Sequence, residues 1–321
     1  MRNGVAGYIL VFSIILRLGL VTCYGNDMQK WPEYVKEIKY ISSADSSMQP
    51  ALFYAPSPKS AVPLVVVLHT WSSDYTQDYG IPYAKWCAEN SWCFIHPNFR
   101  GPNNKKEATG SELAIRDVIN AVEYAKKNAN IDVNRIYLVG YSGGGYTSLL
   151  VAGRFPEIWA GVSVWVPILD IKSWYYECKQ KNLSYANDIK NSCGGIPGES
   201  LAIDFEYRSR SPATFLANAA NLQLDINAGI SDETIPISHS LKAFNLVALK
   251  KDRIPEENIN YFVENKCIPP HIKKFIGEDS LYKEKGVLFR KISGCSRITV
   301  FNGGHDMIPQ ATLVWLNQQK K

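Results

Sequence analysis

The sequence predicts an α/β protein built on a mostly parallel sheet with helices on both faces. Three observations predict it: strands alternate with helices, one central segment is continuously apolar, and the composition suits a large core. Residues 63–68 are all apolar and half of them are β-branched valines, which is typical of a strand buried on both faces. With 321 residues, 46% hydrophobic and 20% charged, the chain can bury one large core and is too apolar to be disordered.

The expected elements follow in chain order. Two short antiparallel strands come first, and parallel strands then alternate with helices. The expected strands are 36–42, 51–54, 63–68, 92–96, 135–139, 160–166, 222–228 and 297–301. The expected helices are 81–89, 111–128, 144–154, 239–250 and 307–318, and the second has apolar residues at helical spacing.

Two insertions interrupt this alternation, at about 172–214 and 251–296. Both are longer than the usual connections of about two to six residues. Because active-site lids are the usual reason for such insertions, we expect two caps over the open end of the sheet. The sequence therefore predicts one catalytic domain, 36–321, that carries two caps.

A glycine-rich turn surrounds Ser142 in the run Gly140-Tyr141-Ser142-Gly143-Gly144. Gly-x-Ser-x-Gly alone is a weak signal. Here an expected strand enters it and an expected helix leaves it, which is the elbow that exposes a nucleophilic serine. The flanking glycines avoid clashes in this tight turn, and the Gly143 amide at the helix start can bind a developing oxyanion. We therefore expect Ser142 to be a nucleophile.

A base and an acid are expected after the serine, in the order Ser, Asp or Glu, His. His305 follows the last expected strand and is the leading base, with His271 as the alternative. Asp232 lies in a turn after a strand, at the sheet edge where catalytic groups gather, and Asp170 is its rival. The acid would hold the imidazole in the required tautomer.

A second oxyanion donor is expected from the loop after the third strand, 69–73. Any residue but proline can supply a backbone amide. The amide of Trp71 is the candidate.

Five stretches carry a resemblance to a known family, and they occur in the family's order: 98–101, 132–146, 211–212, 229–236 and 303–305. Together they resemble the catalytic domain of the prolyl oligopeptidase family (peptidase S9) and its esterase-like relatives, over about 62–316. The resemblance implies an α/β-hydrolase fold and a serine hydrolase whose triad is Ser142, Asp232 and His305, with no cofactor and no metal. Roughly 35 residues precede the expected sheet, fewer than the substrate-screening propeller of the peptidases needs.

The triad does not distinguish an ester from a peptide substrate, because both reactions use an acyl-enzyme. Tyr75, Tyr141, Trp165 and Trp174 are expected near the mouth of the site, where they could stack on sugar rings or pack as core. Arg100 could bind a substrate carbonyl or carboxylate, or instead buttress a loop. We favour an ester hydrolase, possibly one acting on acylated carbohydrate. The alternatives are a peptidase acting on short peptides and a non-catalytic binding protein.

The N-terminus predicts export. Residues 1–25 have a basic start and a short apolar run that Arg17 interrupts, as in a cleaved signal peptide. A secreted or periplasmic protein without a stable membrane span fits best; lipidation at Cys23 and an uncleaved anchor are alternatives. The formal charge of +5 forms no basic stripe, so a nucleic-acid partner is not expected. The oligomeric state is left open.

Six further cysteines are an even number in this context, which indicates disulfides. Sequential pairing, with Cys178 to Cys193 and Cys267 to Cys295, is the simplest of the possible patterns. Six unpaired thiols are the alternative. The cysteines concerned are Cys87, Cys93, Cys178, Cys193, Cys267 and Cys295.

Overall fold

A computed structural model describes residue 1 and residues 30–57, 60–274 and 277–321. The expected signal segment beyond Met1, with Cys23 in it, lies outside the described residues. None of the described helices is long and apolar enough to cross a membrane.

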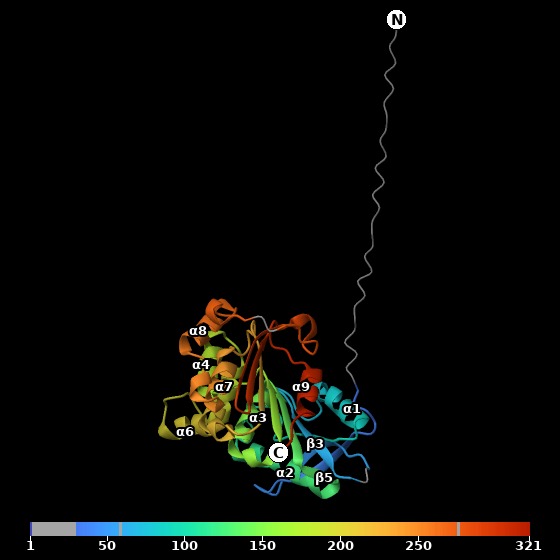
Figure 1. The fold of residues 1–321 in the computed structure, drawn as a ribbon. Coiled ribbons are helices and arrows are strands. Elements are labelled where there is room, and N and C mark those ends of the chain that lie inside the picture. Colours follow the sequence, from blue (N-terminus) through green and yellow to red (C-terminus); the bar gives the residue numbers. More distant parts are fainter. Residues whose placement is uncertain (2–29, 58–59, 275–276) are drawn as a thin grey trace.

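Nine strands form one sheet in the order β1-β2-β4-β3-β5-β6-β7-β9-β8 (Figure 1). The pairs from β4 through β3, β5, β6 and β7 to β9 are parallel. The pairs β1–β2, β2–β4 and β8–β9 are antiparallel. The strands are β1 Lys36–Ile41, β2 Met48–Tyr54, β3 Val62–Leu68, β4 Cys93–Pro97, β5 Ile131–Tyr141, β6 Gly161–Trp165, β7 Leu224–Gly229, β8 Val287–Ser293 and β9 Ser296–Phe301.

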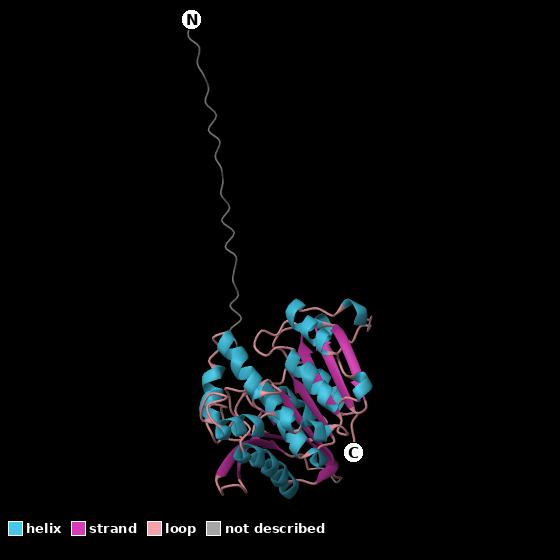
Figure 2. Ribbon diagram, turned by 90° about the vertical axis from the view of Figure 1, so that its left-hand side faces the viewer, coloured by secondary structure: helices cyan, strands magenta, loops and turns pink. Residues whose placement is uncertain are grey.

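Helices cover both faces of the sheet (Figure 2). Helices α1 and α9 lie together on one face, and α2, α3 and α7 pack on the other. Alternate residues of β3 serve the two cores: Leu64 and Val66 face one, and Val65 and Val67 face the other. This explains why the strand is continuously apolar. These helices are α1 Ile81–Glu89, α2 Glu112–Asn128, α3 Gly143–Arg154, α7 Ser238–Val247 and α9 Pro309–Leu316.

The first insertion folds into three helices that pack on one another, α4 Ile171–Gln180, α5 Tyr185–Cys193 and α6 Leu201–Ser209. The second begins with α8 Glu256–Asn265, which packs on α7.

Part of the second insertion belongs to the sheet, and the expectation of a cap along its whole length is wrong. Strand β8 pairs antiparallel with β9 across a tight turn at Gly294, whose φ of 55° lies in the region that glycine favours. As an edge strand β8 is only partly buried, so it lacks the apolar run that marks the central strands.

The six described cysteines are free thiols, so the expected disulfides are absent from these described residues. Cys87 packs in the core on the α1 face, whereas Cys93 packs in the core on the opposite face of the sheet. Cys178 and Cys193 are buried as core side chains, and Cys267 is exposed. Burial raises the pKa of the Cys178 thiol to about 12, which keeps it protonated and unreactive.

Candidate active site

Ser142 lies at the turn between β5 and α3 with φ 57° and ψ −120°, a strained conformation for a residue with a side chain. Its amide donates to the Trp165 carbonyl at the end of β6. The neighbouring glycines are required by close packing. A Cβ on Gly140 would collide with the backbone of Gly144, and one on Gly144 would collide with the carbonyl of Leu68. The sequence therefore folds into the sharp elbow that it predicts.

Three loops at the carboxyl edge of the sheet bring Ser142, His305 and Asp232 together. His305 Nε2 lies 2.9 Å from Ser142 Oγ, and His305 Nδ1 lies 2.8 Å from Asp232 Oδ2. The other carboxylate oxygen of Asp232 accepts the amides of Thr234 and Ile235 at 2.8 and 3.0 Å. The Asp232 side chain is 1% exposed and that of His305 25%. Substrate can therefore approach the imidazole while the carboxylate stays out of solvent.

The hydrogen-bond partners determine what this arrangement can do. A carboxylate only accepts, so His305 must carry its proton on Nδ1 when the imidazole is neutral. Nε2 then has a free lone pair directed at the Ser142 hydroxyl. This is the arrangement in which an imidazole can take the serine proton.

The amides of Trp71 and Gly143 lie against each other beside the serine. A Cβ on Gly143 would collide with the backbone nitrogen of Trp71. Within the described residues neither amide donates to a protein acceptor. Two unpaired amides this close together, one of them at a helix N-terminus, can bind an anionic oxygen.

Tyr141 supports the loop that carries His305. Its hydroxyl donates to the His305 carbonyl at 2.7 Å, and its ring lies 5.2 Å from the imidazole, centroid to centroid. Burial raises the pKa of Tyr141 to about 12, so it remains a hydrogen-bond donor. On the other side of the loop, Asp306 accepts the Gly304 amide at 3.0 Å and pairs with Lys285 at 2.6 Å.

Trp165 and Trp174 do not line the mouth of the site; of the two roles considered for them, the structure shows packing in the core and not stacking on substrate. Trp165 is fully buried, and its indole donates to Thr312 of α9 at 2.7 Å. Trp174 is 1% exposed and packs edge-on against Trp71, with ring centroids 4.8 Å apart. Both rings are covered by segments remote in the chain, so they act as core. The Trp71 indole in turn donates to Asp188 of α5 at 3.2 Å, which attaches the first cap to the loop after β3.

The Arg100 guanidinium is engaged by two carboxylates and a hydroxyl, which corrects its expected role in substrate binding. Its Nε donates to Asp117 at 2.6 Å, and its Nη1 donates to Asp45 at 2.7 Å. Its remaining nitrogen contacts both carboxylates and Ser42. The guanidinium therefore joins α2 to the turn between β1 and β2.

Three other residues considered from the sequence take no part in the hydrogen bonds that join Ser142, His305 and Asp232. Tyr75 is half-buried. Burial raises the pKa of its hydroxyl, and the negative charge of the nearby Glu37 in β1 raises it further. Asp170 caps the N-terminus of α4, accepting the Ser173 amide at 2.7 Å. His271 lies in a short 3-10 turn of the second insertion.

Two supporting residues were missed by reasoning from sequence. Asp306 orders the His305 loop, and Asp188 holds the Trp71 side chain. Asp306 directly follows His305, which could have drawn attention to it. Asp188 had no local signal, because its partner is 117 residues away. Among the described residues, no group of three or more His, Cys, Asp or Glu could hold a metal ion.

Comparison with known proteins shows the family and the fold. The family model described as "Prolyl oligopeptidase family" matches residues 83–262. The curated relatives include uncharacterized proteins named YfhR from Salmonella typhi and Salmonella typhimurium. Each is 24% identical over 205 residues, or 61% of this chain and 63% of the relative.

Several solved structures are similar. An acylaminoacyl peptidase of Pyrococcus horikoshii has a TM-score of 0.52 and 17% identity, covering 66% of this chain and 34% of that one. A puromycin hydrolase has a TM-score of 0.58 and 14% identity, covering 88% and 37%. A thermostable esterase has a TM-score of 0.52 and 15% identity, covering 90% and 64%. The matches span less than two thirds of these proteins, and they confirm the α/β-hydrolase fold.

Proposed function

The chain belongs to the prolyl oligopeptidase family, and we propose that it is a serine hydrolase whose triad is Ser142, His305 and Asp232. The observation that carries the proposal is the unbroken chain of hydrogen bonds from Ser142 Oγ through both imidazole nitrogens to the buried Asp232 carboxylate. A hydroxyl is a weak nucleophile without a positioned base, and this geometry supplies one.

The reaction follows from these positions. Ser142 Oγ attacks the substrate carbonyl carbon while His305 Nε2 takes the serine proton, and the amides of Trp71 and Gly143 bind the resulting oxyanion. His305 then gives that proton to the leaving group, which departs and leaves an acyl group on Ser142. Water attacks the acyl-enzyme with His305 again as base, and this step releases the acid and restores the serine. Asp232 stabilises the imidazolium at each step.

We propose a carboxylic ester as the substrate. Among the structural neighbours the esterase is matched over 64% of its length, the peptidases over about a third. A short peptide is the second candidate substrate, because the family that the chain belongs to is named after an oligopeptidase. The acylated carbohydrate suggested by the sequence depended on Tyr75, Tyr141, Trp165 and Trp174 lying near the mouth of the site, and the two tryptophans were the strongest candidates for stacking on a sugar. Since both are buried, the proposal no longer includes a sugar.

We also propose that the protein is exported, on the strength of residues 1–25 alone. N-terminal sequencing of the protein recovered from cell fractions tests this. A mature chain that keeps residues 1–25 in the cytoplasm would contradict it.

The test of the enzymatic proposal is covalent labelling by a fluorophosphonate probe, with turnover of acetyl, feruloyl and short peptide substrates measured in parallel. Ser142→Ala should abolish labelling and lower turnover by up to about a millionfold. Ser231→Ala, an exposed serine in the Asp232 loop, is the matched control and should retain both. Labelling that persists in Ser142→Ala would refute the nucleophile. Peptide turnover that exceeds ester turnover would select the second candidate.

A further inference from the structure

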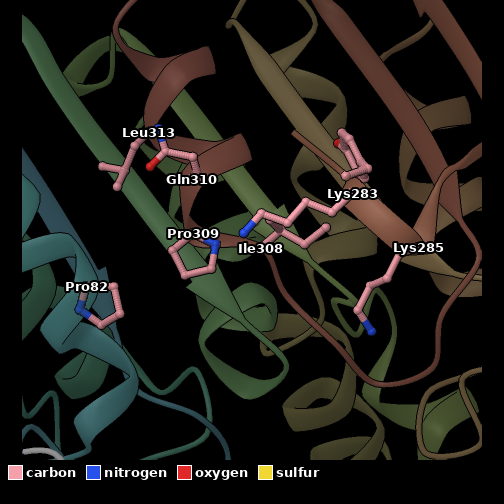
Figure 3. Close-up of a pocket in the computed structure, with 8 residues that line it drawn as sticks. Pro82, Lys283, Lys285, Ile308, Pro309, Gln310 and Leu313 are labelled. Atoms are coloured by element: carbon pink, nitrogen blue, oxygen red, sulfur yellow. The ribbon is translucent and has the colours of Figure 1, made fainter. Parts of the chain in front are cut away.

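A pocket of about 530 Å³ opens beside the loop that carries His305 (Figure 3). It lies between the first turns of α1 and α9 and the segment that precedes β8. Its floor is apolar, and its charged lining consists of two lysines, with no carboxylate among the described lining residues. The lining residues are Pro82, Tyr282, Lys283, Lys285, Ile308, Pro309, Gln310 and Leu313.

The two lysines are not equivalent. Lys285 pairs with Asp306 at 2.6 Å, so its charge is neutralised. Lys283 is exposed and forms no ion pair with the side chains that the structure describes. In Figure 3 its side chain extends across the pocket towards Ile308 and Pro309, whereas Lys285 points away. Lys283 therefore provides the pocket's uncompensated positive charge.

The backbone holds Lys283 in place under strain. Its φ is 47°, in the left-handed region that residues with side chains rarely adopt. The preceding Tyr282 is 1% exposed, and its hydroxyl donates to Asn227 of β7 at 2.5 Å. On the other side, the Asn302 amide contacts the carbonyls of Lys285 and Gly286 at 3.0 and 3.1 Å. A strained residue fixed on both sides, with its charge directed into a cavity, is typical of a functional position.

Other groups in the pocket favour an anion. Helices α1 and α9 both begin here, and the positive ends of their dipoles attract negative charge. The backbone amide of Gln310, in the first turn of α9, donates to no protein acceptor within the described residues. Pro82, Ile308 and Leu313 give the same cavity an apolar side, so it suits an acidic group carried on a hydrocarbon body better than a free inorganic ion.

The pocket also adjoins the loop that carries His305. Ile308 is three residues beyond His305 on the same loop, and Tyr282 packs on Trp165, whose carbonyl accepts the Ser142 amide. We propose that this pocket is a substrate subsite in which Lys283 binds an anionic group, so that the enzyme prefers acidic esters. This inference rests on the proposed hydrolase function and adds the charge of its substrate.

Two pairs of esters, each with one member that carries a carboxylate and one neutral member, test the subsite. On the acyl side, mono-4-nitrophenyl glutarate is compared with 4-nitrophenyl pentanoate. On the leaving-group side, 4-acetoxybenzoate is compared with its methyl ester. In at least one pair, Lys283→Met should lower the charged-to-neutral ratio of kcat/KM about tenfold, and Lys283→Glu should lower it further. Lys127→Met, an exposed lysine on α2, is the matched control and should leave both ratios unchanged.

Unchanged ratios in both pairs, in a Lys283→Met enzyme that still turns over the neutral esters, would overturn the subsite and leave the hydrolase proposal intact. Failure of the wild-type protein to hydrolyse any of the four esters would instead count against the ester hydrolase. Calorimetry then tests the pocket alone, using Ser142→Ala with monomethyl and dimethyl glutarate. Tighter binding of the monoanion that is lost on adding Lys283→Met supports the subsite, and equal binding of the two ligands refutes it.

Discussion

Gly143 and Trp71 are packed so closely that a Cβ on the glycine would collide with the backbone nitrogen of the tryptophan. One amide comes from the start of α3 and the other from the loop after β3, so the absence of a single methyl group lets the two donors meet. The proposed oxyanion site therefore depends on a residue whose own side chain does no chemistry.

Gly143→Ala should consequently impair catalysis. The added methyl group pushes the Trp71 loop away, and losing one oxyanion donor costs about a hundred- to thousandfold in kcat. Gly304→Ala is the matched control beside the same site, because its Cβ would meet only the Ser231 carbonyl at 3.8 Å, an ordinary contact. Steady-state kinetics measures kcat for both variants, and circular dichroism checks that each variant is folded. Because alanine keeps its own backbone amide, a folded Gly143→Ala enzyme with full kcat would show that the Trp71 amide is not needed in this position.

Asp232→Asn should lower kcat by about ten-thousandfold while the fold persists. An amide can still accept from Thr234 and Ile235 through its oxygen, but its NH₂ group would face His305 Nδ1 and favour the wrong imidazole tautomer. Glu233→Gln is the neighbouring control, since the Glu233 side chain is 82% exposed and pairs only with Lys266 on the surface. Comparable kcat values for the two variants would remove Asp232 from the triad.

The sequence predicted the grouping of Ser142, Asp232 and His305 because its signals are local. A strand, a glycine-bounded serine and a helix are contiguous, and the order of Ser142, Asp232 and His305 follows from the topology of parallel strands that end at one edge. The fate of Trp165 could not be predicted in this way. Its burial depends on Thr312, which is 147 residues away and is brought close only by the packing of α9.

The edge strand β8 and the ion pairs of Arg100 could not be predicted from the sequence because both are recognised only once their partners are known. Strand β8 shows its partly buried pattern only once β9 is known to be its partner. The ion pairs of Arg100 join it to Asp45 and Asp117, which are 55 and 17 residues away. From sequence alone, a charged residue near a turn is equally consistent with substrate binding and with structural support. Only the positions of the two carboxylates distinguish these roles.

Arg100→Ala should therefore destabilise the fold with little direct effect on chemistry. Asp117 is fully buried, and burial raises its pKa against the opposing influence of Arg100. Removing the guanidinium leaves the buried Asp117 carboxylate without a partner, and breaking a buried ion pair in this way costs about 3 kcal/mol of unfolding free energy. Urea unfolding measures the loss, and Arg100→Ala with Asp117→Asn should recover part of it. Unchanged stability together with a raised KM would restore Arg100 as a substrate-binding residue.

Acid should destabilise the protein through His96. Burial lowers the pKa of His96 to about 3, with His69 adding to the shift, and an unfolded histidine titrates near 6.5. Between these values the unfolded chain binds the proton and the folded chain does not, so stability falls as pH falls from about 6.5 towards 3. The slope for one such group is about 1.4 kcal/mol per pH unit.

His96→Asn tests this contribution, because an asparagine amide can still donate to the Val67 carbonyl that His96 Nδ1 contacts at 2.6 Å. The free energy of unfolding of the variant should depend less steeply on pH between 6.5 and 4, whatever its absolute value. Parallel slopes for variant and wild type would show that other groups carry the acid sensitivity.

Reducing agents should leave the stability of the protein unchanged, because the described cysteines are free thiols. The exposed Cys267 should react quickly with Ellman's reagent in the native state, and the half-buried Cys295 more slowly. The four buried thiols should react only after unfolding, because burial keeps the reagent away from them and raises the pKa of each thiol. They are Cys87, Cys93, Cys178 and Cys193. A Cys267→Ser variant should lose the fast phase alone. A marked fall in unfolding temperature on adding dithiothreitol, or fewer than six reactive thiols in denaturant, would show that disulfides form after all. Such a result would support the sequence-based prediction that Cys178 pairs with Cys193.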